Sequence, residues 1–361
     1  KKVVDIAMKL EDVPRQTSTH ACGVIIGKDS LEKFIPLSRN GDDITTQYTG
    51  VEMEHLGHLK MDFLGLRNLT DIRMALVYIK ENYGVDIDFD KCTYDDPEVY
   101  KLISSGNTKA IFQIESGGFQ GFMKELRPTC IEDIVAAVSM YRPGPMNAIP
   151  RFVYNKHNPD KVTYAHPILE PILEPTYGCI VYQEQVMRIV QDMAGYTLGQ
   201  ADMVRRMMGK KQVEKMQKEK QVFLYGREAF TDKDGKFNTA IDGAVKRGVP
   251  EDVALQVWAE MEDFAKYAFN KSHAAAYSLV TYQTAYLKTY YEAEFLTSVI
   301  NNRITNSDEI KNYVNYAKEE KIDVLPPNIN KSDTFFTVKD KQIRFGLAAL
   351  KNVGVNVVDQ I

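Results

Sequence analysis

Short apolar runs occupy the first sixty residues, whereas most of the chain after them carries apolar residues at helical spacing. Residues 1–13 place apolar side chains three and four positions apart and therefore predict a helix. Short runs predict three strands of one small sheet, near residues 23–27, 45–48 and 58–62. After Gly65 the helical pattern continues to about residue 320. We therefore expect an α+β protein in which a small sheet precedes a mainly helical body.

The third predicted strand separates charged from apolar side chains. Side chains alternate along a strand, so Lys60 and Asp62 share one face. The other face is expected to be buried and carries Leu59, Met61 and Phe63. A carboxylate two residues from a lysine on a packed strand suits a divalent metal beside a phosphate. The alternative is an edge strand on which Lys60 and Asp62 are simply solvated.

A basic run with helical apolar spacing lies at residues 200–211. One side of the expected helix carries Met203, Val204, Met207 and Met208. Packing on that side would hold Arg205 and Arg206 in place. Guanidinium groups bind phosphate oxygens in pairs and keep their charge, so positioned arginines suit a triphosphate. The alternative is a basic, solvated helix face.

Polar donors also gather ahead of an aromatic helix that is expected to start at Ser278. Asparagine, lysine, serine and histidine follow one another at residues 270–273, which offers donors to a sugar or a phosphate. His273 would equally fit a buried core position.

Further upstream, Pro143 breaks an apolar helix and leaves Arg142 at its end. Near the C-terminus, apolar runs around Asp340 predict a β-hairpin, and residues 347–361 outline a helix-hairpin-helix, which grips the DNA backbone.

Composition narrows the class of protein. A chain of 361 residues with 44% hydrophobic and 26% charged residues is expected to be globular with two or three subdomains. No apolar stretch approaches the roughly 20 residues of a membrane span. The net charge of −4 by itself disfavours nucleic-acid binding, which needs a basic surface, but basic residues concentrate at residues 205–220 and permit a basic groove. Four widely spaced cysteines without a Cys-x-x-Cys pair argue against a zinc site.

Taken together, eight ordered blocks resemble the C-family bacterial replicative polymerases, the DNA polymerase III alpha subunits. The blocks cover residues 60–67, 112–116, 141–145, 174–178, 182–187, 205–211, 269–273 and 325–330. Their order and spacing extend the resemblance over essentially the whole chain. The resemblance implies part of a nucleotidyltransferase-type palm, a helical fingers region and a short hairpin. Its implied boundaries are the end of the thumb at 1–17, palm at 18–66, fingers at 67–330, and hairpin with the start of a helix-hairpin-helix at 331–361.

The resemblance also implies roles for single residues. Asp62 matches the third of three catalytic aspartates and a Mg²⁺ ligand, and Lys60 matches a lysine beside them. The residues implied in nucleotide binding are Arg205, Arg206, Tyr267, Asn270, Lys271, Ser272 and His273, with His273 against the ribose, where it would exclude a 2′-hydroxyl. The residues implied in DNA binding are Arg142, Lys210 and Lys211.

The implied function is DNA-directed DNA synthesis, in which two Mg²⁺ ions assist transfer of deoxynucleotides to a primer 3′ end. The implied partners are primer-template DNA, deoxynucleoside triphosphates, the sliding clamp and other replisome subunits, including the exonuclease-associated ones, in the cytoplasm and away from membranes. The chain departs from the family in one respect, because the paired motif that carries the other two aspartates is not found; Asp86 and Asp88 lie past the palm. The chain alone is therefore expected to be inactive.

Two other functions remain open from the sequence. The basic run and the helix-hairpin-helix outline would also fit a nucleic-acid or nucleotide-binding module without catalysis. A metal phosphohydrolase is disfavoured, because the six histidines show no ligand spacing.

Overall fold

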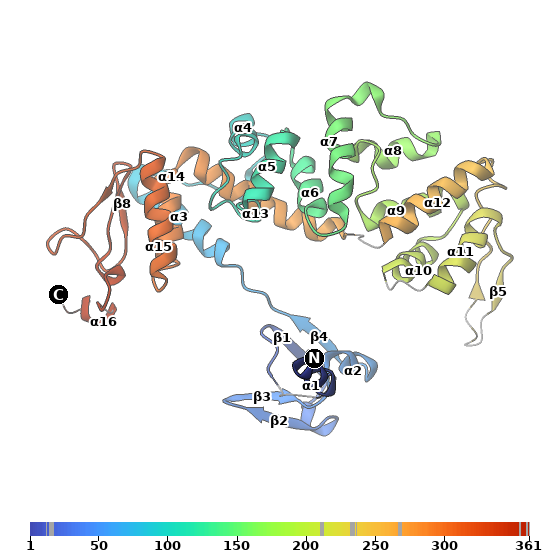
Figure 1. Cartoon of the computed structure of the whole chain (residues 1–361), viewed down its shortest axis with the longest axis horizontal. Coiled ribbons are helices and arrows are strands. Elements are labelled where there is room, and N and C mark those ends of the chain that lie inside the picture. Colours follow the sequence, from blue (N-terminus) through green and yellow to red (C-terminus); the bar gives the residue numbers. More distant parts are fainter. Residues whose placement is uncertain are drawn as a thin grey trace. The chain divides into compact units, whose positions relative to one another are not determined.

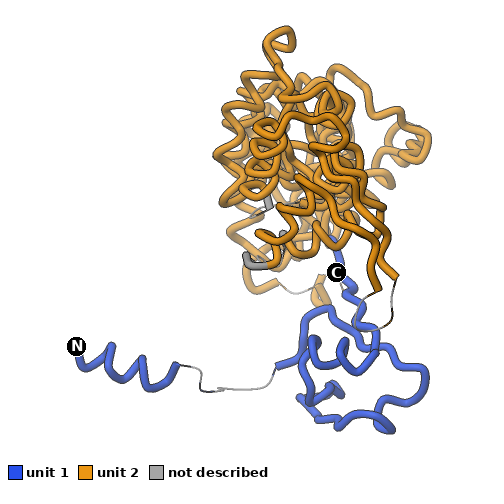
Figure 2. Tube along the Cα trace, turned by 90° about the vertical axis from the view of Figure 1, so that its right-hand side faces the viewer, with its two compact units in different colours: residues 1–66 blue, residues 67–361 orange. Residues whose placement is uncertain are grey.

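The computed structural model describes residues 1–11, 13, 18–209, 213–231, 235, 237–265, 269–353, 355–358 and 360. Contacts divide the chain into two compact units, residues 1–66 and 67–361 (Figure 2). The first unit combines short strands with short helices, and the second unit is mainly helical (Figure 1), so the expected α+β class is confirmed. Within the described residues, no helix combines the length and the apolar character that crossing a membrane requires.

The first unit holds two small antiparallel sheets. Its elements in order are α1 (Lys2–Leu10), β1 (Gly23–Ile26), η1 (Leu31–Lys33), β2 (Leu37–Asn40), β3 (Asp43–Thr46), α2 (Gly50–His55) and β4 (Leu59–Asp62). The three expected strands form, but they do not share one sheet: β1 pairs with β4, and β3 pairs with β2, a strand that the sequence analysis missed. The two-residue turn after Asn40 explains this pairing, because Gly41 has a φ of +63° and so lets the chain reverse at once.

The apolar face of β4 is exposed in this unit, which corrects the expectation of a buried face. Leu59 and Phe63 are 55% and 61% exposed, and Met61 is exposed as well. β1 contributes Val24 and Ile26 to the same face, because Val24 is registered with Met61 and Ile26 with Leu59. A two-stranded ribbon has too few elements to cover both of its faces, so among the described residues this face is not covered by a second layer.

The second unit is built mainly from helices. Its α-helices are α3 (Arg67–Tyr83), α4 (Pro97–Ser105), α5 (Gly117–Leu126), α6 (Ile131–Met140), α7 (Ile149–His157), α8 (Glu170–Leu173), α9 (Gln183–Ala194), α10 (Leu198–Gly209), α11 (Val213–Tyr225), α12 (Glu251–Ala265), α13 (Lys271–Tyr290), α14 (Glu292–Asn301), α15 (Ser307–Glu319) and α16 (Val355–Val358). Short 3-10 helices are η2 (Phe89–Lys91), η3 (Pro145–Ala148), η4 (Pro159–Lys161), η5 (Pro167–Leu169), η6 (Glu174–Thr176) and η7 (Leu347–Ala349). The strands are β5 (Phe230–Thr231), β6 (Phe237–Asn238), β7 (Val324–Leu325), β8 (Thr337–Lys339) and β9 (Gln342–Arg344).

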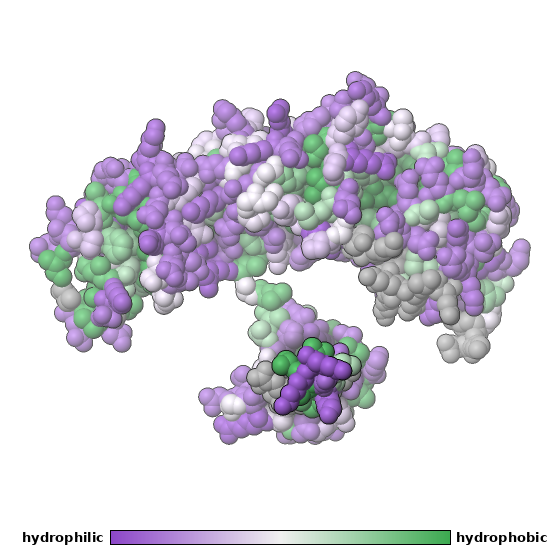
Figure 3. All heavy atoms as spheres, viewed as in Figure 1, coloured by the Kyte–Doolittle hydropathy of each residue, from purple (hydrophilic) through white to green (hydrophobic). Residues whose placement is uncertain are grey.

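Three apolar clusters stabilise the second unit. The first surrounds Trp258 between α9, α10, α11 and α12. The second lies between α4, α5, α6, α7 and α13, and the third joins α3, α14 and α15 to the sheet of β7, β8 and β9. Helix α13 links the last two, because Tyr282 packs in the second cluster and Leu287 in the third. The face seen in Figure 3 is largely hydrophilic. This agrees with a core that encloses most of the large apolar side chains of this unit.

The C-terminal hairpin forms where the sequence predicts it. Strands β8 and β9 are antiparallel, and the two turn residues Asp340 and Lys341 have φ values of +51° and +60°. Two positive φ values match the turn whose twist fits a β-hairpin. The unpredicted strand β7 adds to β9 in parallel and completes a three-stranded sheet.

Candidate functional site

Asp62 forms an ion pair with Lys60 on the hydrogen-bonded ribbon of β1 and β4. Lys60 Nζ lies 3.0 Å from Asp62 Oδ1 and 3.2 Å from Oδ2. Two glycines leave the room that this pair needs. A Cβ at Gly23 would lie 2.9 Å from Lys60 Cε and 3.0 Å from Asp62 Oδ1, and one at Gly50 would lie 3.0 Å from Lys60 Cδ. The two predicted residues are thus neighbours, and the carboxylate is held by a cation.

His20 and Cys22 lie beside this carboxylate, which the sequence analysis did not foresee. His20 Nδ1 is 3.6 Å from Cys22 Sγ and 4.0 Å from Asp62 Oδ1. One donor atom from each of the three residues lies within 4.8 Å of the others. The His-x-Cys spacing ahead of β1 is a local signal for two of these residues, whereas Asp62 is brought to them only by the pairing of β1 with β4.

The described residues around Asp62 do not fit a Mg²⁺ site by themselves. Mg²⁺ prefers oxygen ligands and is usually bound by one or two carboxylates together with substrate phosphates. The described donor cluster here offers one carboxylate, one imidazole and one thiol. The ammonium group of Lys60 already neutralises that carboxylate. Any Mg²⁺ ion bound by Asp62 therefore needs further oxygen ligands.

Arg205 and Arg206 of α10 share one carboxylate in the second unit. Arg205 Nη2 lies 2.7 Å from Asp202 Oδ1, and Arg206 Nε donates to Oδ2 at 2.8 Å. The hydrogen bond from Arg205 is the main cause that lowers the pKa of Asp202. Arg205 is the more enclosed of the two and also donates to Gln183 Oε1 at 3.0 Å. Both guanidinium groups are thus held in place by named partners.

The apolar backing of α10 matches the prediction in part. Val204 is buried and Met207 packs against the first apolar cluster, as expected. Met203 is exposed instead. The side chain of Met208 lies outside the described residues, as do Lys210 and Lys211.

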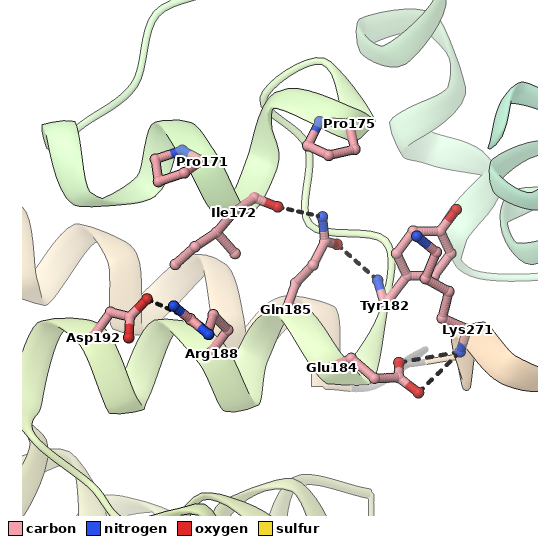
Figure 4. A pocket seen from close by; sticks show the side chains of 9 residues that line it. All are labelled: Pro171, Ile172, Pro175, Tyr182, Glu184, Gln185, Arg188, Asp192 and Lys271. Carbon is pink, nitrogen blue, oxygen red and sulfur yellow. Dashed lines mark hydrogen bonds and ion pairs between the residues drawn. The ribbon is translucent and has the colours of Figure 1, made fainter.

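The start of α13 is tied to the first turn of α9. Asn270 caps α13, because its Oδ1 accepts the amide of His273 at 2.9 Å. The Nδ2 of Asn270 donates to Glu184 Oε1 at 3.1 Å. The Lys271 amide donates to both oxygens of Glu184 at 3.2 and 3.1 Å, as Figure 4 shows. The cap explains why the helix starts at Lys271 and not at Ser278. Residues 271–273 thus belong to the first turn of α13, where Ser272 is exposed.

Aromatic rings surround His273 on the surface. Its ring centroid lies 4.3 Å from that of Tyr277 and 5.5 Å from that of Phe269. Phe112 continues the series at 5.3 Å from Tyr277, and the Arg142 guanidinium lies 4.2 Å from the Phe269 centroid. Because His273 is exposed, the alternative of a buried core histidine is wrong. The remaining member of the predicted group, Tyr267, lies outside the described residues.

Successive residues of α9 therefore join the two predicted nucleotide-binding segments. Gln183 accepts from Arg205, and Glu184 holds Asn270 and Lys271. A cavity of about 430 Å³ adjoins this junction, and Tyr182, Glu184, Arg188 and Lys271 are part of its wall (Figure 4). The ammonium of Lys271 lies 5.2 Å from the Tyr182 ring centroid and pairs with Glu132 at 3.0 Å. Cations from α10 and α13 thus converge on one end of α9.

Comparison with known proteins assigns both units. The family model described as the bacterial DNA polymerase III alpha subunit finger domain matches residues 68–230, and that of the alpha NTPase domain matches residues 1–65. Proteins named DNA polymerase III subunit alpha are similar over nearly the whole chain: that of Thermus aquaticus is 45% identical over 98% of the chain, and that of Aquifex aeolicus is 43% identical over 98%. The chain belongs to the bacterial DNA polymerase III alpha subunit family.

The resemblance inferred from the eight sequence blocks is therefore confirmed. The chain spans 28% of the length of the Thermus aquaticus alpha subunit and 29% of that from Aquifex aeolicus. Arg142, Arg205 and Arg206 lie within the finger-domain match of this family, whereas Lys60 and Asp62 lie within the NTPase-domain match. A helix-hairpin-helix model matches residues 321–361, which include the sheet of β7, β8 and β9 together with α16.

Proposed function

We propose that this chain is the part of a replicative DNA polymerase that binds the incoming deoxynucleoside triphosphate and contributes one catalytic carboxylate. The observation that carries the proposal is the junction at α9, where Gln183 contacts Arg205 and Glu184 contacts Asn270 and Lys271. The reaction is template-directed addition of deoxynucleotides to a primer 3′ end. Primer-template DNA, the sliding clamp and other replisome subunits in the cytoplasm are the partners of the longer protein.

The triphosphate binds the guanidinium groups of α10 in this proposal. Asp202 holds Arg205 and Arg206 side by side through its two oxygens. Each guanidinium keeps further N–H donors for phosphate oxygens, and planar forks bind such oxygens in pairs. Since neither arginine can lose its proton at neutral pH, the pair neutralises the charge that develops on the leaving pyrophosphate.

The sugar and base lie towards the start of α13. His273 presents an exposed ring that packs against Tyr277 at an angle of 33°, and the Arg142 guanidinium lies over the ring of Phe269. A ring at this position restricts the space at the ribose and so excludes a 2′-hydroxyl, while Ser272 and Lys271 supply donors. Arg142, with Lys210 and Lys211, contacts the DNA backbone, where arginine and lysine serve as phosphate ligands.

Asp62 contributes one ligand of the catalytic metal pair. Two Mg²⁺ ions, when bound, supply charge stabilisation for the attacking and leaving oxygens. The further carboxylates come from outside the cluster of His20, Cys22 and Asp62, which lacks them in the described residues. Lys60 offsets the charge of Asp62 by pairing with it at 3.0 Å.

Alanine at both arginines tests the nucleotide site. We expect Arg205→Ala with Arg206→Ala to abolish deoxynucleoside triphosphate binding by the chain, measured by calorimetric titration. The matched control is Arg247→Ala, which removes an exposed arginine that pairs with Asp242 and does not line the cavity beside α9. Binding that survives the double substitution, or that is lost equally in the control, contradicts the proposed site.

A second candidate function is a DNA-binding module without catalysis, which the helix-hairpin-helix match at residues 321–361 favours. It predicts salt-sensitive DNA binding that does not change in the double arginine variant. Nucleotide binding that depends on Arg205 and Arg206 therefore separates the two functions.

The 361-residue chain is expected not to extend a primer by itself, because a single carboxylate paired with lysine retains Mg²⁺ poorly. The measurement is primer extension with the purified chain, Mg²⁺ and all four deoxynucleoside triphosphates. The positive control is the longer polymerase under the same conditions. Incorporation that depends on Mg²⁺ and is lost in Asp62→Asn would overturn this expectation.

A further inference from the structure

We propose that His20, Cys22 and Asp62 form a site for a borderline-soft divalent cation such as Zn²⁺. His20 and Cys22 lie just before β1, Asp62 is the last residue of β4, and the donor atoms of the three side chains lie within 4.8 Å of one another. An imidazole, a thiolate and a carboxylate with one open position form a donor set that Zn²⁺ and Co²⁺ take in tetrahedral geometry. This site differs in chemistry from one for Mg²⁺, which takes oxygen ligands.

The donor separations fit a common metal centre. Bonds of about 2.0 Å to nitrogen and about 2.3 Å to sulfur place the two ligand atoms about 3.5 Å apart at a tetrahedral angle. His20 Nδ1 and Cys22 Sγ are 3.6 Å apart. Asp62 Oδ1 is 4.0 Å from Nδ1, against about 3.3 Å in such a centre. The carboxylate oxygen therefore has to approach the imidazole nitrogen by about 0.7 Å, and its separation from the thiol is at most 4.8 Å.

The backbone fixes the three residues relative to one another. Gly23 is registered with Asp62, and the Phe63 amide donates to the Cys22 carbonyl at 2.9 Å. His20 Nδ1 accepts hydrogen bonds from the amides of Gly23 at 2.7 Å and Cys22 at 3.2 Å, so this nitrogen carries no proton and its lone pair faces these amides. A bound cation replaces these two hydrogen bonds, and the Cys22 thiol releases its proton to solvent.

Lys60 weakens binding of the cation, because its ammonium group lies 3.0 Å from Asp62. The cation and Lys60 therefore compete for one carboxylate. As a consequence that rests on the proposed function, an ion held here withdraws Asp62 from catalysis, and the site acts as an inhibitory one. The binding itself does not depend on that function.

Cobalt serves as the probe of the site. We expect the reduced 361-residue chain to bind one Co²⁺ with a near-ultraviolet thiolate-to-metal absorption band, which added Zn²⁺ removes. Cys22→Ser and His20→Ala are expected to lose the band and to bind at least about tenfold more weakly. Lys60→Met is expected to bind Co²⁺ more tightly, since it removes the competing cation.

Cys130→Ser is the matched control, because Cys130 is an exposed thiol near the carboxylate of Asp133 in the other unit. It is expected to keep the band. Circular dichroism of each variant without metal verifies that the fold is intact. A folded wild-type chain without the band, or a band that survives Cys22→Ser, overturns the proposal. Because the readout is an absorption band, failure of the polymerase proposal leaves this result unaffected.

Discussion

Single residues differ sharply in what their ion pairs contribute to stability. Lys156 and Asp133 form a pair at 2.9 Å in which the side chains are 7% and 1% exposed. Asp133 also accepts from the Thr129 amide at 2.8 Å and from the Tyr177 hydroxyl at 2.8 Å. Burial alone would raise the pKa of Asp133, but these hydrogen bonds and Lys156 lower it. The second apolar cluster thus encloses a charge that depends on its partners.

Removing the lysine is expected to destabilise the second unit strongly. Lys156→Met leaves the Asp133 carboxylate buried beside fewer donors, which costs about 3 kcal/mol or more. The measurement is urea unfolding at pH 7. The matched control is Lys101→Met, which breaks an exposed pair with Glu98 at 3.1 Å and is expected to cost less than about 1 kcal/mol.

The cost of Lys156→Met is also expected to depend on pH. The folded-state pKa of Asp133 lies below its unfolded value, so the pairing contributes stability above that unfolded value and loses it as pH falls through the folded one. The gap between wild type and variant should therefore narrow below about pH 4. A gap that stays constant or widens as pH falls would contradict the assignment of the effect to this carboxylate.

At the scale of elements, apolar periodicity predicts the helices and the hairpin well. It fails where side-chain hydrogen bonds decide the outcome. Polar residues 270–273 resemble a loop, but the cap at Asn270 and the contacts of Glu184 turn them into the first turn of α13. Strand β2 was missed because its four residues, Leu37–Asn40, have no apolar alternation, and the turn at Gly41 sets the pairing.

In the candidate site too, contacts between residues close in sequence are predictable, whereas contacts between distant residues are not. The neighbours Lys60 and Asp62 follow from strand alternation, and they do form a pair. The link between α10 and α13 through Gln183 and Glu184 depends on residues that are about 20 to 90 positions apart in sequence. Spacing alone carries no signal for such contacts. The cluster of His20, Cys22 and Asp62 is missed for the same reason, because register and not sequence distance brings Asp62 to the other two.

For the whole molecule, the boundary between residues 66 and 67 separates two units that differ greatly in how many apolar side chains they bury. In the described residues, all three apolar clusters lie within 67–361, whereas the buried apolar side chains of the first unit are Ile35 and Met53. Buried apolar area is the main source of folding free energy. The second unit is therefore expected to be stable without the first, and the first to have little stability of its own.

Limited proteolysis tests this difference in stability. Phe63 and Leu64 lie between β4 and α3 in a segment without helix or strand, and both are largely exposed. A low concentration of chymotrypsin is expected to cut there first and to leave a resistant product that begins at residue 64 or 65. That product should unfold cooperatively with the same thermal midpoint as the second unit in the intact chain, because its clusters are complete. Replacing Phe63 and Leu64 with serine provides the control and should delay the first cut. A product that is degraded at once, or that melts without cooperativity, would mean that residues 1–66 stabilise the helical unit after all.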